Sequence, residues 1–198
     1  MKPNAGFTLV EMMISVAILA ILLGIGMPSF QRFIENTKIR TTADSLQAGL
    51  NLARTEALRR NARVSFWLVN NVSASCARSA SGTSWVVAFD NPAGVCNAAA
   101  SDTAVPRIIQ SYSGSDGSSG MGVSALNGAG NAASCITFNG FGTVEPNCGA
   151  NEVPIWRIKV ESANAASTAR KLDVRITSGG AVRMCDPAVT STTDPSRC

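Results

Sequence analysis

The chain has 198 residues, of which 45% are hydrophobic and 15% are charged, a composition that suits one domain of moderate size plus an apolar segment. Its 17 basic and 13 acidic side chains give a net charge of +4, which permits contact with anionic lipid or nucleic acid but demonstrates neither. The absence of histidine excludes the side chain most often used in general acid–base catalysis.

The first predicted element is the apolar run of residues 7–27, which contains one charged side chain, Glu11. At about 1.5 Å of rise per residue, a helix of this length matches the ~30 Å core of a bilayer. We therefore predict a transmembrane helix over residues 7–29. Because a carboxylate in hydrocarbon costs several kcal/mol, Glu11 indicates a functional role.

The sequence GFTLVE, residues 6–11, preceded by Lys2, resembles the type III signal of type IV pilins and type II secretion pseudopilins. The resemblance implies that residues 1–6 are a leader, which a prepilin peptidase removes by cutting between Gly6 and Phe7. It also implies N-methylation of the new Phe7 amine. In an assembled filament Glu11 would pair with that amine on a neighbouring subunit, so that neither charge is buried alone.

Two other interpretations fit this segment less well. A secretory signal peptide would be cut after the apolar run, and GIG at residues 24–26 is a poor cleavage site. An ordinary membrane anchor gives no reason for Glu11. Pro28 also matches the pilin pattern, and we expect it to kink or locally melt the helix, helped by Gly24 and Gly26.

Residues 30–62 are predicted to continue the stem as an amphipathic helix that ends near Asn61. Apolar side chains recur there at intervals of three and four residues, which is typical of a helix with one buried face. These side chains are Phe30, Phe33, Ile34, Ile39, Ala43, Leu46, Leu50, Ala53 and Ala57. The whole stem would have roughly 50 residues and measure on the order of 80 Å.

The end of this helix and the residues after it, 50–66, resemble the helix-to-first-strand passage of the H-type pseudopilin and FimT/FimU minor-pilin family. Arg59, Arg60 and Arg63 crowd the last turn, where cations interact favourably with the helix dipole. We interpret these three arginines as a solvated cap.

From Val64 onward the pattern changes to short β-branched or aromatic runs bounded by turn residues. The predicted strands are residues 64–69, 85–89, 107–112, 135–138, 155–160, 172–177 and 181–184. Leu172, Val174 and Ile176 should share one face of the sixth strand, and SGGA at 178–181 should turn it into a hairpin. The predicted fold class is α+β and pilin-like: a long N-terminal helical stem packed on an antiparallel β-sheet domain of residues 63–198.

The connection 113–130 is rich in glycine and serine, so we expect it to be mobile or only loosely packed. Its SGSDGSSG sequence does not continue into a phosphate-binding G-K-[ST] motif. One carboxylate, Asp116, cannot supply the oxygen ligands of a calcium site.

The six cysteines all follow the stem, and their even number in a domain expected outside the cytoplasm indicates disulfides. No C-x-x-C pair is present, so no metal site is predicted. Sequential pairing is the simplest of the many possible connectivities, because each pair then brackets a turn-rich loop between strand-like segments. The expected bonds are Cys76–Cys96, Cys135–Cys148 and Cys185–Cys198.

We predict neither enzymatic activity nor a cofactor, because no nucleophile has a suggestive base beside it. The resemblance implies three non-catalytic roles: a minor pilin of a type IV pilus, pseudopilin H of a type II secretion system, or a DNA-binding minor pilin for natural transformation. The expected disulfides and long loops favour the first. The implied partners are prepilin peptidase, other pilins or pseudopilins bound through the N-terminal helix, and inner-membrane lipid, with residues 63–198 in the bacterial periplasm.

A weak DNA contact is predicted on the final hairpin, where Lys171, Arg175 and Arg183 gather with Arg170 nearby. The ending RITSGGAVRMC resembles that of FimT-like members, although Ala181 stands where a further arginine is expected. The alternative is that these cations are simply solvated. A phosphate contact would weaken steeply with salt.

Overall fold

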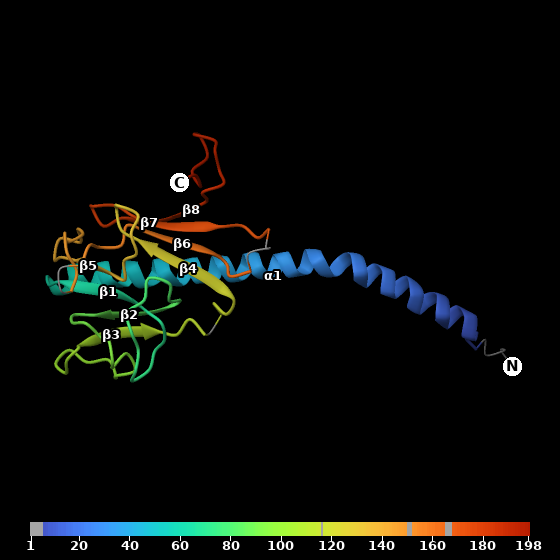
Figure 1. Ribbon diagram of the computed structural model, residues 1–198, viewed down its shortest axis with the longest axis horizontal. Coiled ribbons are helices and arrows are strands. Elements are labelled where there is room, and N and C mark those ends of the chain that lie inside the picture. The colour runs from blue at the N-terminus through green and yellow to red at the C-terminus, as the bar shows by residue number, and fades with distance from the viewer. Residues whose placement is uncertain (1–5, 116, 150–151, 165–167) are drawn as a thin grey trace.

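The computed structural model describes residues 6–115, 117–149, 152–164 and 168–198, and it describes side chains for all of these except residues 24–29. In this part of the chain one long helix, α1, precedes eight short strands (Figure 1). The elements are α1 (Leu9–Arg60), β1 (Val64–Val69), β2 (Ser84–Ala88), β3 (Ile108–Tyr112), β4 (Met121–Leu126), β5 (Cys135–Phe138), β6 (Arg157–Ser162), β7 (Leu172–Ile176) and β8 (Val182–Cys185). The predicted α+β class with a helical stem is confirmed.

Helix α1 has a defined start and a defined end. Thr8 is its N-cap, and the hydroxyl oxygen of Thr8 accepts a hydrogen bond from the Glu11 N–H at 3.2 Å. The C-cap is Asn61 in the left-handed conformation with φ 46°, close to the predicted end. The backbone stays helical past Pro28, so the chain is not melted there, and the projecting half of α1 bends away from the domain (Figure 1).

The strands form two four-stranded antiparallel sheets, ordered β3-β2-β1-β5 and β4-β6-β7-β8. The second half of α1 packs against both sheets through the predicted apolar stripe. Its fully buried members are Ile39, Ala43, Leu46, Leu50, Ala53 and Ala57, which share one core with Phe66 and Phe138 of the first sheet and Ile158 and Val174 of the second. Gly49 lets the helix backbone approach the first sheet closely, because a Cβ at this position would lie 2.8 Å from the rings of Phe66 and Trp85.

Strand β1 is buried on both faces, unlike a strand with one solvated face. Phe66 and Leu68 join the core against α1, whereas Trp67 and Val69 belong to a second core on the other face. That second core contains the four cysteines of two disulfides. The first sheet is therefore enclosed between the helix and disulfide-linked loops.

The expectation that residues 113–130 are loosely packed is wrong for their centre. Strand β4 lies there and pairs with β6, with Val123 opposite Val160 and Ala125 opposite Ile158. Val123 and Ala125 are buried in the main core. Gly122, Ser124 and Ala125 of this strand have little intrinsic strand preference, so pairing with β6 stabilises the strand more than its own composition does.

Candidate functional site

The predicted cleavage site lies in exposed, non-helical chain. Gly6 and Phe7 are both exposed and precede the N-cap Thr8, whose backbone is extended with φ −83° and ψ 151°. The Gly6–Phe7 peptide bond therefore lies outside the hydrogen-bonded turns of α1. A protease could bind this bond without unwinding the helix, and cleavage itself stays a prediction.

Glu11 lies in the first turn of α1, and its side chain is exposed. Its backbone N–H is capped by Thr8, and its carbonyl oxygen accepts a hydrogen bond from the Ser15 hydroxyl at 2.8 Å. A carboxylate at this position interacts favourably with the positive end of the helix dipole. Among the described residues, no cation forms an ion pair with Glu11.

The projecting half of α1 exposes large apolar side chains around its whole circumference. Each is more than half exposed: Leu9, Val10, Met12, Met13, Ile14, Val16, Ile18, Leu19, Ile21, Leu22 and Leu23. Within the described residues, however, no helix combines the length and hydropathy of a membrane span. The side chains of residues 24–29, which belong to the predicted span, lie outside the described set, and the span at 7–29 stays a prediction.

The structure joins the six cysteines in the sequential pairs expected from the spacing: Cys76–Cys96, Cys135–Cys148 and Cys185–Cys198. Two of the bonds lie in the second core, and the third closes the segment that follows β8. Cys135, Cys148 and Glu152 are close enough to share an ion, but the two sulfurs are bonded to each other and Glu152 pairs with Arg78. This group therefore offers no thiolate ligands.

The basic residues predicted for DNA contact lie on or beside the β7–β8 hairpin, but two of the three are already engaged. Lys171 Nζ lies 2.7 Å from a carboxylate oxygen of Glu161. Arg175 lies 3.7 Å from Asp173 and donates a hydrogen bond from Nη1 to the Cys198 carbonyl oxygen at 3.4 Å. Arg183 is exposed, and no acid in the described chain pairs with it.

Strand register adds a cation that the sequence did not reveal. Arg157 of β6 lies opposite Arg175 of β7, which lies opposite Arg183 of β8. We call these three residues the arginine row. Neighbouring strands lie about 4.8 Å apart, and like charges directly opposite one another destabilise a sheet. Lys159 lies beside the row and lines the same groove as Arg157 and Arg175. The row therefore places three guanidinium groups side by side on the outer face of the second sheet, above a groove that Glu161 and Asp173 also line.

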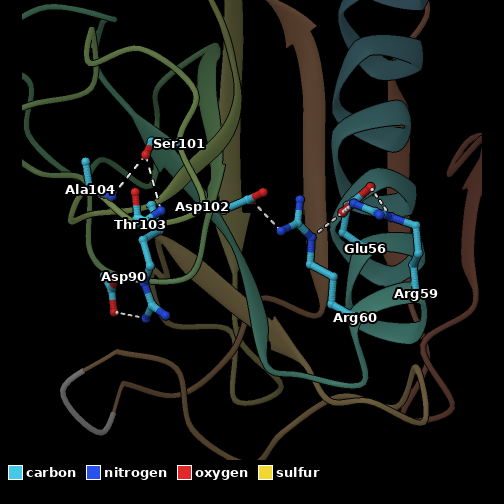
Figure 2. Close-up of polar contacts among 9 residues, drawn as sticks. Glu56, Arg59, Arg60, Asp90, Ser101, Asp102, Thr103 and Ala104 are labelled. Atoms are coloured by element: carbon cyan, nitrogen blue, oxygen red, sulfur yellow. Dashed lines mark hydrogen bonds and ion pairs between the residues drawn. The ribbon is translucent and has the colours of Figure 1, made fainter.

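At the end of α1, Arg59 and Arg63 are exposed, as expected for a solvated cap. The interpretation is wrong for Arg60, whose side chain is only 23% exposed and forms specific ion pairs (Figure 2). A Glu56 carboxylate oxygen lies 2.6 Å from Arg59 Nη2 and 2.7 Å from Arg60 Nε. Arg60 also pairs with Asp102 in the β2–β3 connection, and Arg63 pairs with Glu145 at 3.4 Å. The hydrogen bond from Arg59, supported by that from Arg60, holds the pKa of Glu56 below its ordinary value.

The β2–β3 connection contains an ion pair of its own and makes an aromatic contact with the helix end. Arg107 binds both carboxylate oxygens of Asp90 at 2.8 Å, which lowers the pKa of Asp90 and raises that of Arg107. The Phe89 ring contacts two guanidinium groups, with centroid distances of 5.3 Å to Arg60 and 4.9 Å to Arg107.

Asp102 is positioned by a turn within the same connection. The Ser101 hydroxyl accepts hydrogen bonds from the N–H groups of Thr103 and Ala104, and Figure 2 shows Asp102 directed toward Arg60. The Arg60–Asp102 pair therefore joins the loop to the stem, and the Arg107–Asp90 pair stabilises the loop itself.

Comparison with known proteins adds two family matches. Residues 1–27 match the prokaryotic N-terminal methylation motif, and residues 42–180 match the family described as type II transport protein GspH. Strand β8 and the segment after it follow the second match. No curated protein sequence matches the chain significantly.

Two crystal structures of the type IV minor pilin FimU from Pseudomonas aeruginosa, strain PAO1, are similar in fold. The first is 12% identical in sequence, its alignment covers 77% of this chain and 97% of the FimU chain, and the TM-score is 0.47. The other is 14% identical, covers 81% and 97%, and has a TM-score of 0.48. Since the GspH match spans well over half of the chain, the predicted family is confirmed, and this protein belongs to the GspH family of pilin-like proteins with an N-terminal methylation motif.

Proposed function

We propose that the chain is a non-catalytic minor pilin of a type IV pilus. In this proposal prepilin peptidase cuts between Gly6 and Phe7 and methylates Phe7, residues 7–29 anchor the chain in the bacterial inner membrane, and residues 63–198 lie in the periplasm. The subunit then enters a filament, or its initiating or tip complex, through α1. The methylation motif and the family support this role.

The observation that carries the proposal is the exposed apolar half of α1. Large apolar side chains at 9–23 project away from the domain and contact none of its core. Leaving one such side chain in water instead of burying it costs about 1.5–3 kcal/mol. The stretch therefore requires an apolar environment from outside the subunit, which lipid supplies before assembly and neighbouring helices supply afterwards.

Glu11 and the Phe7 amine would determine how neighbouring helices meet. An isolated charge in an apolar filament core is strongly unfavourable, whereas two opposite charges in contact compensate one another. Glu11 makes no ion pair among the described residues of its own chain, so its carboxylate is available to the amine of a neighbour.

Glu11→Ala tests this role. We expect the variant to insert into the membrane at least as well as wild type, because the cost of burying the carboxylate disappears. Cross-linking of the variant to partner pilins, by a reagent that does not react with cysteine, should decrease strongly. Ser15→Ala, one turn further along the same half, is a matched control and should cross-link normally. Wild-type cross-linking by Glu11→Ala would contradict the proposed pairing.

The alternative within the family is pseudopilin H of a type II secretion system, which the GspH description itself favours. We prefer the pilus because the β-sheet domain, residues 63–198, contains three disulfides and long connections between strands. Deleting the gene and measuring both twitching or pilus assembly and protein secretion distinguishes the two: loss of piliation alone supports the pilus, and loss of secretion alone supports the pseudopilin.

The arginine row favours a second candidate function, a sequence-independent contact with DNA. Its three guanidinium groups lie side by side in register, and neither Arg157 nor Arg183 forms an ion pair with a described acid. Guanidinium groups bind phosphate oxygens well because they present several N–H donors in a fixed plane. Natural transformation is the process that such a contact would serve.

Fluorescence anisotropy with a short labelled DNA duplex and the full chain in neutral detergent tests this contact. Arg175→Gln with Arg183→Gln should weaken binding to all sequences alike and flatten the salt dependence by about 0.9 for each lost phosphate contact. Arg32→Gln with Arg40→Gln, two exposed stem arginines, is the control. Absence of binding by wild type at low salt would exclude the function.

A further inference from the structure

The segment after β8 forms a closed loop rather than a free tail. Residues 186–198, which we call the strap, are joined to β8 by the Cys185–Cys198 disulfide. The strap leaves the sheet, projects outward and returns (Figure 1). Its two ends are also joined by backbone, because Asp186 and Arg197 form a parallel bridge and the Asp186 N–H donates to the Ser196 carbonyl oxygen at 2.7 Å.

Both ends of the strap lie at Arg175, the central residue of the arginine row. At one end the Cys198 carbonyl oxygen accepts a hydrogen bond from Arg175 Nη1. At the other end Pro187 lines the groove that contains Arg157 and Arg175. The Arg175 side chain is 36% exposed, and its Nε is buried without a hydrogen-bond partner among the described atoms. Arg175, at the centre of the row, is therefore partly covered, whereas Arg183 is exposed.

The strap also carries charge complementary to this face. It contains two acids, Asp186 and Asp194, and one base, Arg197, which gives one minus two, or −1. Asp186 pairs with Arg170 at 2.7 Å. Hydrogen bonds from Ser196, with a smaller contribution from the Arg170 cation, lower the pKa of Asp194. The strap thus brings a carbonyl acceptor to Arg175, and its two carboxylates lie near Arg170, beside the β7–β8 hairpin.

We propose that the strap masks the arginine row, so that opening it exposes Arg175 and strengthens binding of a phosphate backbone to this surface. The inference rests on the proposed DNA contact. The Nη1 donor of Arg175 must exchange the Cys198 carbonyl oxygen for a phosphate oxygen before it can bind DNA, whereas Arg183 is exposed already. With the strap closed the row engages DNA through its ends, and with the strap open it engages through all three guanidinium groups.

Two measurements on the full chain in neutral detergent test the masking. The open-strap variant is Cys185→Ser with Cys198→Ser, and the matched control is Cys76→Ser with Cys96→Ser, which removes the disulfide that links the β1–β2 and β2–β3 connections. The first measurement is modification by phenylglyoxal, an arginine-specific dicarbonyl, quantified by mass spectrometry with Arg183 as the internal reference. Modification of Arg175 should rise several-fold in the open-strap variant and stay at the wild-type level in the control.

The second measurement is fluorescence anisotropy with the labelled duplex. The open-strap variant should bind several-fold more tightly than wild type, with a salt slope steeper by about 0.9 for the added phosphate contact. A second variant, Asp194→Asn, keeps the disulfide and the one side-chain oxygen, Oδ1, that accepts the hydrogen bonds from Ser196. It should give a smaller gain in affinity, which protects the test against misfolding of the open-strap variant.

The outcomes separate the strap from the DNA contact. Unchanged Arg175 modification and unchanged affinity in the open-strap variant would overturn the masking, while binding by wild type would still support the contact. Increased Arg175 modification without DNA binding by any variant at low salt would overturn the DNA contact and the regulatory role of the strap together. An equal gain in the Cys76→Ser with Cys96→Ser control would also contradict the proposal, because it would indicate general loosening.

Discussion

The two halves of α1 have the same backbone but opposite surroundings. From Ile39 to Ala57 the apolar side chains form one stripe that is buried by two sheets, whereas residues 9–23 expose apolar side chains on all sides. A helix with one apolar stripe can bury that stripe against its own domain, whereas a helix that is apolar all round requires an apolar environment from outside. The difference indicates which half stabilises the subunit and which half is available for assembly.

The largest expected effect separates the halves by stability. Leu46→Ala removes a fully buried side chain and should cost about 2–5 kcal/mol, which lowers the Tm by roughly 5–20 °C. Leu19→Ala changes an exposed side chain of the projecting half and should leave the Tm of the full chain in detergent unchanged. Thermal unfolding followed by circular dichroism measures both. Equal losses would mean that the projecting half also packs on the domain.

Gly49→Ala sharpens the comparison within the packed half. The added Cβ would lie 2.8 Å from two buried rings, Phe66 and Trp85, and Trp85 is further held by a hydrogen bond from Nε1 to Ser45 at 3.0 Å. Overpacking costs about 1–3 kcal/mol and outweighs the gain of about 1 kcal/mol in helix propensity. We expect a net loss of about 1–2 kcal/mol by chemical denaturation. A variant more stable than wild type would show that the rings can move apart.

The junction between the helix and the β2–β3 connection should make stability depend on pH. The folded-state pKa of Glu56 is lowered from its ordinary value of 4.5, so its contribution is fully present above about pH 4.5 and is lost as the pH falls through the folded pKa. Glu56→Gln should cost on the order of 1 kcal/mol at pH 7 and very little at the acid end. Urea unfolding at about pH 3 and about pH 7 measures this difference. The same loss of stability in Glu56→Gln at both pH values would contradict the role of the carboxylate.

The smallest expected effect is at Arg40, on the exposed side of the packed half. Arg40 Nε lies 3.7 Å from Asp44, and both side chains are more than half exposed. Exposed pairs at this spacing contribute about 0.3–0.5 kcal/mol and are screened by salt. Arg40→Gln should therefore change the free energy of unfolding by less than about 0.5 kcal/mol. A larger loss would indicate a contact of Arg40 that the exposure of its side chain does not suggest.

Local patterns were sufficient to predict the stem, its apolar stripe and most strands. The stripe from Ile39 to Ala57 follows from helical periodicity, and the sequential disulfides follow from cysteines that bracket turn-rich loops. Strand β4 could not be predicted in this way, because Gly122, Ser124 and Ala125 have weak strand preference and the strand depends on pairing with β6.

The surface features also depended on long-range pairing. Arg157 joins Arg175 and Arg183 only through the β6–β7 register, which no local pattern specifies. Likewise, the partner of Arg60, Asp102, lies in a connection far along the chain. The helix dipole favours cations at the end of α1 but does not specify which acids they pair with.

Intact-mass analysis of the protein purified from its own membrane tests the central claim most directly, which is that the projecting apolar half is kept for assembly. We predict a mature chain that begins at N-methylated Phe7 and retains Glu11 and the whole of α1. Replacing Gly6 with a bulky residue should leave the leader attached. A mature chain that begins after Gly26 would contradict the account, because the projecting half would then be a discarded signal peptide.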